Sequence, residues 1–258
     1  MPIIDTHSHI FLEEFDADRQ GVVERAAKAG INYHIFPNID SSTSDRLLKI
    51  SGESKNFYPL MGLHPTSVNS NLEEELKHVE KMLSTNTFWG IGEIGMDLYW
   101  DKTYIEQQKV AFRHQLKLAK KFKLPVAIHA RNAFAEIFEI VDSEIDENLR
   151  GVFHCFTGTI DDYKRITGYK TFKVGIGGVV TYKNGGVDKL LPYMDTSLLL
   201  LETDSPYLSP VPMRGKRNEP FNLTYIVAKI AEVLGYSEQK VKEITFANAV
   251  ELFNLPIM

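Results

Sequence analysis

Eight short apolar segments alternate with longer amphipathic segments along this chain of 258 residues, and this alternation restricts its possible folds more than any other feature. The apolar segments are predicted strands, at residues 2–4, 32–36, 57–63, 88–94, 125–128, 151–153, 172–176 and 197–201. Helical periodicity follows each of them, at residues 16–30, 42–53, 72–83, 104–122, 133–145, 160–167, 187–194, 223–234 and 238–253. Strands that alternate with helices indicate a parallel sheet with helices packed against it.

The number and composition of these units favour a closed barrel. Residues 126–128 and 198–201 are entirely apolar, as expected for strands that are buried on both faces. Eight strand–helix units without a long linker fit a (β/α)8 TIM barrel, and a doubly wound open sheet is the alternative. We therefore expect an α/β fold in which residues 1–258 form a single TIM-barrel domain.

Composition narrows the class of protein. The chain is 43% hydrophobic and 24% charged, as in an ordinary globular domain, and its single cysteine, Cys155, fits a reducing compartment. The N-terminal residues lack a secretory signal, and no run approaches the roughly 18 apolar residues of a membrane helix, so a cytoplasmic protein is expected. The net charge of −5 argues against a broad basic face, so any nucleic-acid contact would rely on a local cluster and on metal charge.

Residues that commonly ligate metals fall where the predicted strands end. The active site of a (β/α)8 barrel lies at the C-terminal ends of its strands. Each such residue alone fits a structural role, but together they predict a metal site at one rim of the barrel. The candidate ligands are His7, His9, Glu93, His129, His154 and Asp204. His64, at the end of the third strand, is expected at the same rim but not as a ligand. The other three histidines, His34, His78 and His114, fall within a strand or in helices and are expected to be structural.

This donor set is too large for one tetrahedral ion and suits two divalent ions with Glu93 as a bridge. His7 and His9 are expected on one ion, and His129 and His154 on the other. Asp204 is expected to ligate the first ion and to hold a water molecule. Mixed imidazole and carboxylate ligands suit Zn, Mn, Fe or Mg, and the sequence does not decide among them. Cys155 is not expected to be a ligand.

Seven short motifs, in this order and spacing, resemble those of the TatD-type metal-dependent deoxyribonucleases of the amidohydrolase superfamily. The resemblance covers essentially the whole chain, and the motifs are DTHSH at 5–9, GLHP at 62–65, GEIGMD at 92–97, PVAIHAR at 125–131, HCFTG at 154–158, ETDSP at 202–206 and RGKRNEP at 214–220. It implies a TIM barrel, the six metal ligands named above, and metal-dependent hydrolysis of DNA phosphodiesters, often from the 3′ ends of single strands. Many amidohydrolases use a carbamylated lysine as the bridge, whereas here Glu93 occupies that role.

Several residues are expected to serve the reaction beside the metals. Asp204 would accept the proton of the attacking water, and Glu93 is its catalytic partner as the bridge. Substrate phosphate is expected to bind four side chains, His64, Arg131, Arg214 and Arg217, although the last two also fit a solvated loop. Tyr99 and Trp100 could stack a terminal base or pack as a lid. Asp5 is expected to orient His7 or His9, and Glu202 to support the site.

The sequence thus predicts a metal-dependent deoxyribonuclease of 3′-5′ exonuclease type, with single-stranded DNA or 3′ ends as substrate and a monomer or weak oligomer as its state. An amidohydrolase or lactonase acting on small molecules remains an alternative on the same site. So does a hydrolase of aminoacyl-tRNA esters. A metal-bound scaffold without catalytic activity is the third alternative.

Overall fold

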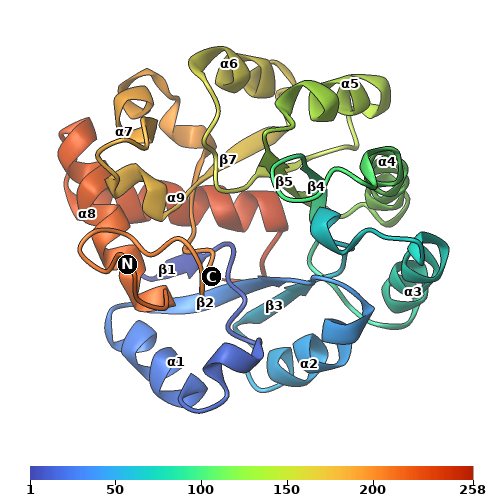
Figure 1. The fold of residues 1–258 in the computed structure, drawn as a ribbon. Coiled ribbons are helices and arrows are strands. Elements are labelled where there is room, and N and C mark those ends of the chain that lie inside the picture. The colour runs from blue at the N-terminus through green and yellow to red at the C-terminus, as the bar shows by residue number, and fades with distance from the viewer. Residues whose placement is uncertain (258) are drawn as a thin grey trace.

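The computed structural model describes residues 1–257, and its eight strands are parallel and surrounded by helices (Figure 1). The strands are β1 (Ile3–Asp5), β2 (Ile31–Pro37), β3 (Phe57–Leu60), β4 (Ile91–Asp97), β5 (Val126–Arg131), β6 (Gly151–Phe153), β7 (Phe172–Ile176) and β8 (Leu199–Leu201). The helices are α1 (Arg19–Lys28), α2 (Ser41–Ser51), α3 (Leu72–Thr85), α4 (Ile105–Phe122), α5 (Phe134–Glu144), α6 (Ile160–Gly168), α7 (Val187–Leu190), α8 (Leu223–Leu234) and α9 (Glu238–Phe253). The predicted (β/α)8 barrel is confirmed.

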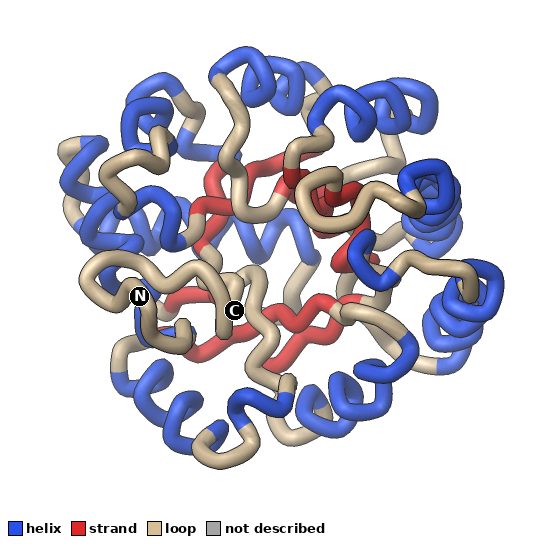
Figure 2. Tube along the Cα trace, in the orientation of Figure 1, coloured by secondary structure: helices blue, strands red, loops and turns tan. Residues whose placement is uncertain are grey.

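Backbone hydrogen bonds join the strands into two sheets, β1-β2-β3 and β4-β5-β6-β7-β8. Single parallel bridges connect the sheets at both seams, Met61 with Ile91 and Ser8 with Ser205. The Thr6 amide also donates to the Leu201 carbonyl at 2.9 Å. Figure 2 shows the strands in red enclosed by the helices in blue. Strands adjacent in sequence are therefore adjacent in space, which aligns their C-terminal ends at one rim.

The core has two parts, as expected for strands that are buried on both faces. The larger part lies between the strands and the outer helices. The smaller part fills the barrel interior, where Ile4, Leu60 and Leu200 pack together with Leu252 and Phe253 of α9. Because α9 crosses that end of the barrel (Figure 1), the opposite end is left for polar side chains.

Local sequence explains several helix boundaries. Asp40 caps α2, because its side chain accepts the Ser42 amide at 3.0 Å, and Thr43 completes the capping box. At the end of α8, Gly235 adopts a left-handed conformation, which costs glycine little. The helix predicted at 187–194 ends at Leu190 and continues as a 3-10 turn containing Pro192, which has no backbone N–H to donate.

One predicted boundary is wrong in a way that affects the site. The fourth strand was expected at 88–94 with a loop through Asp97, whereas β4 runs from Ile91 to Asp97. Its last three residues pair with β5, with Asp97 opposite Arg131. Gly95 and Asp97 resemble turn residues, but here the neighbouring strand extends the pairing and buries Asp97. Among the residues that the structure describes, no helix has the length and apolarity needed to cross a membrane.

Candidate metal centre

Glu93 lies at the middle of the histidine cluster. It is the third residue of β4 and is 3% exposed. Its Oε1 atom lies 2.7 Å from His154 Nε2, 2.8 Å from His129 Nδ1 and 3.2 Å from His64 Nε2. These histidines follow β6, lie on β5 and follow β3, so the parallel strands bring three imidazoles to one carboxylate oxygen.

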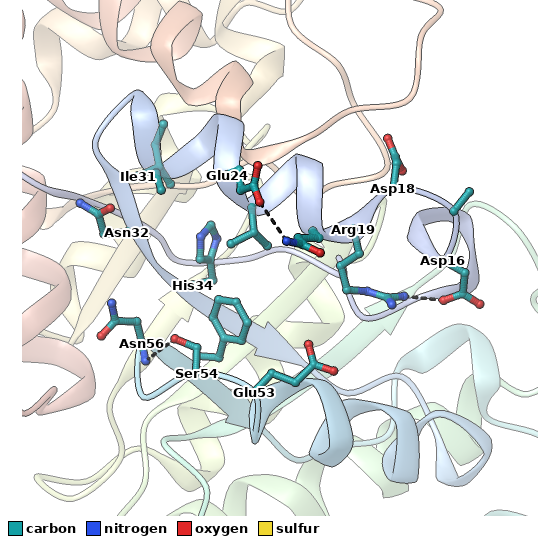
Figure 3. Close-up of a pocket in the computed structure, with 15 residues that line it drawn as sticks. Asp16, Asp18, Arg19, Glu24, Ile31, Asn32, His34, Glu53, Ser54 and Asn56 are labelled. Atoms are coloured by element: carbon teal, nitrogen blue, oxygen red, sulfur yellow. Dashed lines mark hydrogen bonds and ion pairs between the residues drawn. The ribbon is translucent and has the colours of Figure 1, made fainter.

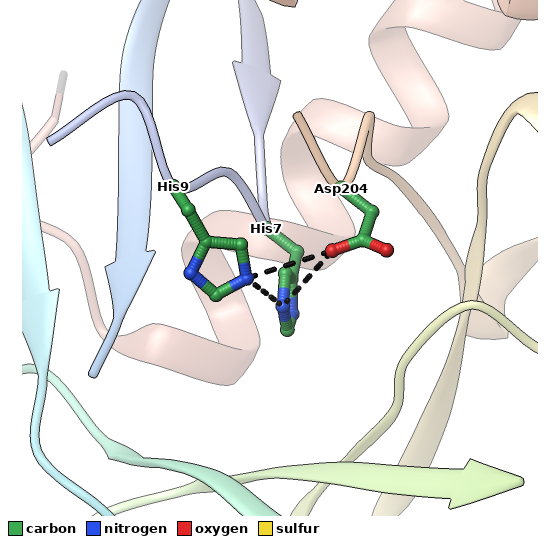
Figure 4. A group of neighbouring side chains, drawn as sticks. All are labelled: His7, His9 and Asp204. Atoms are coloured by element: carbon green, nitrogen blue, oxygen red, sulfur yellow. Dashed lines mark hydrogen bonds and ion pairs between the residues drawn. The ribbon is translucent and has the colours of Figure 1, made fainter. Parts of the chain in front are cut away.

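The other carboxylate oxygen of Glu93 faces a second group of candidate ligands. Glu93 Oε2 lies 3.0 Å from His7 Nε2 and 3.6 Å from His9 Nε2. Asp204 closes this group, with Oδ1 at 3.7 Å from His7 Nε2 and 3.5 Å from His9 Nε2. Figure 4 shows both imidazoles pointing toward the Asp204 carboxylate. Glu93 therefore divides its two oxygens between two sets of imidazoles.

Backbone hydrogen bonds between the segments after β1 and β8 position His7, His9 and Asp204. The amide of Asp204 donates to the carbonyl of His7 at 2.8 Å, and the amide of His9 donates to the carbonyl of Ser205 at 2.7 Å. Asp204 has a φ of 56°, a left-handed conformation that asparagine and aspartate tolerate better than most residues. These bonds hold the segments after β1 and β8 side by side, although they are almost 200 residues apart in the sequence.

Both carboxylates of the cluster are held in the anionic form. Burial opposes ionisation of Glu93, but the facing imidazoles of His154, His64 and His7 outweigh it and lower its pKa well below the usual range. Burial likewise opposes ionisation of Asp204, whereas its contacts with His9 and His7 lower its pKa. The site is therefore an anionic centre lined by imidazoles.

The pKa values of the histidines shift in different directions beside these carboxylates. Burial lowers the pKa of His7, and the neighbouring His154 lowers it further. Burial would lower the pKa of His9 too, but Asp204 and Glu93 prevail and raise it to about 9. The carboxylates also prevail over burial at His129 and His154, whose pKa values are raised. Protons on these imidazoles balance the charge of Glu93 and Asp204, and a divalent cation can replace them.

The nitrogen and oxygen atoms of the cluster are suited to bind a divalent cation in place of these protons. Three groups of side chains have ligand atoms that all lie within 4.8 Å of one another: His7, His9 and Asp204; His7, His154 and Glu202; and His64, Glu93 and His129. Neutral imidazole nitrogens and carboxylate oxygens together suit Zn, Mn, Fe or Mg. The six predicted ligands are thus brought together, and His64 and Glu202 lie close enough to take part.

Asp97 is a residue of the site that was not predicted from the sequence. Its Oδ2 atom lies 2.9 Å from Nε2 of His129, on the ring edge away from Glu93. Burial opposes ionisation, but the bonds from His129 and from the following loop amides lower the pKa of Asp97 to about 2. Strand alternation places Glu93, Gly95 and Asp97 on one face, a signal that the predicted strand end concealed. Asp97 therefore fixes the orientation of the His129 ring, which leaves Nδ1 for a metal.

We expect Asp97→Asn to weaken metal affinity about 10- to 100-fold, because the amide lacks the negative charge that holds the His129 ring. Titration with a chelator competitor measures this directly. The matched control is Asp101→Asn, since Asp101 lies in the same loop but accepts only from Thr103. Equal affinity in Asp97→Asn and wild type would show that His129 does not need this partner.

Asp5 acts differently from the prediction. It was expected to orient the imidazole of His7 or His9, but Oδ1 accepts the Thr203 amide at 2.9 Å and lies 3.4 Å from the His7 amide, while Oδ2 accepts the Thr203 hydroxyl at 2.6 Å. Burial raises its pKa to about 8. Asp5 therefore ties together the backbones that carry His7 and Asp204.

Glu202 supports the segment after β6. Its carboxylate accepts the Cys155 amide and lies 3.6 Å from His154 Nδ1.

His64 contacts Glu93 within the cluster, although it was predicted only as a phosphate-binding residue at the rim. Its Nδ1 accepts the Thr66 amide at 3.1 Å, so a neutral ring carries its proton on Nε2, which faces Glu93. Burial lowers the pKa of His64 and favours this neutral form. The side chain is 13% exposed, and its Nε2 lies 3.2 Å from Glu93 Oε1.

The predicted phosphate-binding arginines separate into two kinds. Arg131 stacks on the ring of Tyr99 and Arg214 on the ring of Tyr182, with guanidinium carbons 4.0 and 3.9 Å from the ring centroids. Neither arginine forms an ion pair with a carboxylate in residues 1–257. Arg217 instead donates to both carboxylate oxygens of Asp18, at 2.9 and 2.7 Å, and its guanidinium is occupied by that pair.

One cavity lies away from these residues. It has a volume of about 670 Å3 and is a groove on the outside of the barrel between α1, β2 and the segment after α2 (Figure 3). Asp16 in its lining already pairs with Arg19 and Arg46. His34 lines the groove and is 1% exposed. His78 and His114 bond to Ser44 and Glu80 on the outer helices, so these three histidines take no part in the cluster.

His34 makes folding sensitive to acid. Burial lowers its pKa from 6.5 to about 4, so between these values the unfolded chain binds a proton that the folded chain does not. The stabilising effect of a neutral His34 is complete above pH 6.5 and is lost as the pH falls toward 4. We expect His34→Phe to lose about 3 kcal/mol less unfolding free energy than wild type between pH 7 and pH 4. Urea titrations in a chelator measure this, and equal losses would contradict it.

Comparison with known proteins places the chain among metal-dependent hydrolases. A family model described as TatD related DNase matches residues 4–254. The chain is 35% identical over 254 residues to the uncharacterized metal-dependent hydrolase YabD of Bacillus subtilis (strain 168), covering 98% of this chain and 99% of that protein. It is 30% identical over 257 residues to the 3′-5′ ssDNA/RNA exonuclease TatD of Cronobacter sakazakii (strain ATCC BAA-894), covering 97% of each.

The fold agrees with a solved structure. The crystal structure of YjjV, a TatD homologue from Escherichia coli K12, is 28% identical and superimposes with a TM-score of 0.93 over 98% of each chain. The match to the family model, over residues 4–254, includes every candidate ligand.

Proposed function

The chain belongs to the TatD family of metal-dependent hydrolases, and from this premise we propose that it is a deoxyribonuclease that hydrolyses phosphodiester bonds at the 3′ ends of single-stranded DNA. The Cronobacter relative named as a 3′-5′ ssDNA/RNA exonuclease supports this substrate class. The proposed cofactor is a pair of divalent ions, Zn, Mn or Mg, bound by His7, His9, Glu93, His129, His154 and Asp204.

One observation carries the proposal: the carboxylate of Glu93 faces different imidazoles with each of its oxygens. Oε1 faces His154 and His129, and Oε2 faces His7 and His9. This is the arrangement that a carboxylate shared by two cations requires. Ions bound there would polarise a phosphoryl oxygen and acidify a water molecule, which is the chemistry that phosphodiester hydrolysis demands.

Asp204 is suited to receive the proton of the attacking water. Its side chain is 14% exposed, compared with 3% for Glu93, so a substrate at the barrel mouth can reach it. Its lowered pKa keeps it ionised and therefore able to accept a proton. Glu93 is too enclosed for that task and serves to hold the cluster together.

Substrate phosphate needs donors at the rim, and the structure offers three candidates. His64 presents its Nε2–H beside Glu93, whereas Arg131 and Arg214 present guanidinium groups without carboxylate partners in the described chain. Asn218 holds the loop of Arg214 to the site by donating to the carbonyls of Thr203 and Tyr207. The two guanidinium cations favour an anionic phosphodiester over a neutral lactone or amide.

The test is metal-titrated hydrolysis of end-labelled single-stranded DNA, run beside bis(p-nitrophenyl) phosphate, a lactone and an aminoacyl-tRNA. Wild type is expected to shorten the DNA from its 3′ end only when Zn, Mn or Mg is present. His129→Ala is expected to lose this activity, because the variant lacks one ligand of the cluster. The matched control is His114→Ala, since His114 pairs with Glu80 on the outer helices.

Other outcomes would decide against the proposal. Turnover of the lactone or the aminoacyl ester without cleavage of either phosphodiester would assign the site to carbonyl hydrolysis. Bound metal without turnover of any substrate would support a scaffold role. Equal cleavage by wild type and His129→Ala would point to a contaminating nuclease.

A further inference from the structure

We propose that Tyr99, Trp100 and Arg131 form a binding platform for an unpaired terminal nucleobase and its phosphate, beside the metal centre. This inference rests on the proposed function and specifies how the same site would distinguish a single-stranded end from a paired one. The three side chains belong to the loop after β4 and to the end of β5.

The two aromatic rings are unusually open to solvent. Tyr99 is 52% exposed and Trp100 is 67% exposed, whereas most large apolar side chains of the chain are buried. Their ring centroids lie 4.9 Å apart with an interplanar angle of 85°. Adjacent exposed aromatic rings on a loop at an active-site rim are suited to contact a ligand.

Arg131 adds a cation to these rings. Its guanidinium carbon lies 4.0 Å from the centroid of Tyr99 and 5.1 Å from that of Trp100. Since Arg131 has no carboxylate partner in residues 1–257, its N–H donors are available to a phosphate. An aromatic face beside a free guanidinium matches the two parts of a nucleotide, a base to stack and a phosphate to neutralise.

Asp97 holds the platform rigidly to the metal centre. Its Oδ1 accepts the amides of Tyr99 at 2.9 Å and Trp100 at 3.1 Å, while its Oδ2 bonds His129 at 2.9 Å. The Leu98 amide also donates to the Arg131 carbonyl at 2.9 Å. One carboxylate thus links the aromatic loop to a candidate ligand, and Arg131 lies two residues beyond that ligand, about 7 Å along the strand.

Stacking on Tyr99 and Trp100 favours a DNA end whose terminal base is unpaired. A base in a duplex is stacked on its neighbours and paired with its partner, so its face is not free to bind the rings. A terminal base of a single strand is free, and stacking tolerates any of the four bases. A small aliphatic lactone or amide has neither an aromatic face for the rings nor an anionic group for the guanidinium.

Fluorescence tests the platform without any turnover. The chain has two tryptophans, so Trp89→Phe leaves Trp100 as the single reporter. Trp89 is half-buried against Tyr58, and phenylalanine retains an aromatic ring there. In excess EDTA, a five-nucleotide single-stranded DNA is expected to quench Trp100 in a saturable manner. The same strand in a blunt duplex, or with an abasic 3′ end, is expected to quench it weakly or not at all.

Kinetics provide the second readout on the metal-loaded protein. Trp100→Ala is expected to raise KM for single-stranded DNA by about 5- to 150-fold, the equilibrium equivalent of one base–aromatic stack. The wild-type preference for a normal over an abasic 3′ end should disappear in this variant, and Trp100→Phe should restore part of it. Tyr193→Ala is the matched control, because Tyr193 is 74% exposed on the outer 3-10 turn after α7.

The outcomes separate this proposal from the proposed function. Quenching by single-stranded DNA without metal-dependent cleavage would retain the platform and overturn the nuclease. Cleavage with no quenching, or with equal KM values for Trp100→Ala and wild type, would retain the nuclease and overturn the platform. Equal quenching by the duplex, or equal KM values for normal and abasic ends in wild type, would also overturn it.

Discussion

Asparagine in place of Asp204 is expected to lower kcat by about 100- to 10,000-fold, the usual contribution of a positioned proton acceptor. The amide cannot accept the proton of the attacking water, although its carbonyl oxygen still faces His9. Asparagine also tolerates the left-handed φ of 56° that this position adopts, so the backbone should not change. Turnover of single-stranded DNA in saturating metal measures the effect.

The fold and the metal content are expected to survive this substitution. Circular dichroism and elemental analysis of the purified variant check both points. Asp161→Asn is the matched control, because Asp161 is an exposed carboxylate at the start of α6. If Asp204→Asn keeps kcat within about tenfold of wild type, the general-base role is refuted. A variant without bound metal would make Asp204 primarily a ligand.

Glutamine in place of Glu93 is expected to abolish metal binding at both groups of ligands. Glu93 supplies the negative charge that faces imidazoles on two sides, and a neutral amide would remove the one counter-charge that the two groups share. Affinity for Zn or Mn should fall by more than about 100-fold, beyond the loss expected for a residue that only supports a ligand. Isothermal titration and elemental analysis measure this loss.

The same substitution has a readout that does not depend on metal. Because Glu93 helps to raise the pKa of His154 and His129, both pKa values should fall in Glu93→Gln. NMR titration of the histidine rings in EDTA would follow them. Glu75→Gln is the matched control, since that carboxylate accepts from Ser41 on the outer helices. Two ions bound with wild-type affinity in Glu93→Gln would exclude the shared carboxylate.

The sequence predicted which candidate ligands would lie together because of a property of the fold. His7, His129 and His154 follow or end apolar runs, and the C-terminal ends of parallel barrel strands meet at one rim. Placement at a strand end therefore specifies proximity in space without knowledge of any contact. The structure accordingly brings all six predicted ligands into one cluster, while His34, His78 and His114 lie outside it.

The sequence could not predict which partner each polar side chain finds. Arg214 and Arg217 occur in one basic loop and looked equivalent. Only the folded chain shows that Arg217 pairs with Asp18, 199 residues away, whereas Arg214 stacks on Tyr182. Asp5 likewise bonds the backbone across the seam rather than the neighbouring imidazole, because β1 and β8 are adjacent only in the closed barrel.

Asp97 separates what local sequence signals determine from what only tertiary contacts determine. Hydrophobic alternation by itself determined eight strand–helix units and the strand ends near which the candidate ligands occur, since those signals are local and repeat along the chain. The tertiary structure alone decided that β4 continues to Asp97, because pairing with β5 extends the strand beyond its local propensity. That extension buries one carboxylate between His129 and the loop of Tyr99 and Trp100, a contact that depends on distance in space and not on distance in sequence.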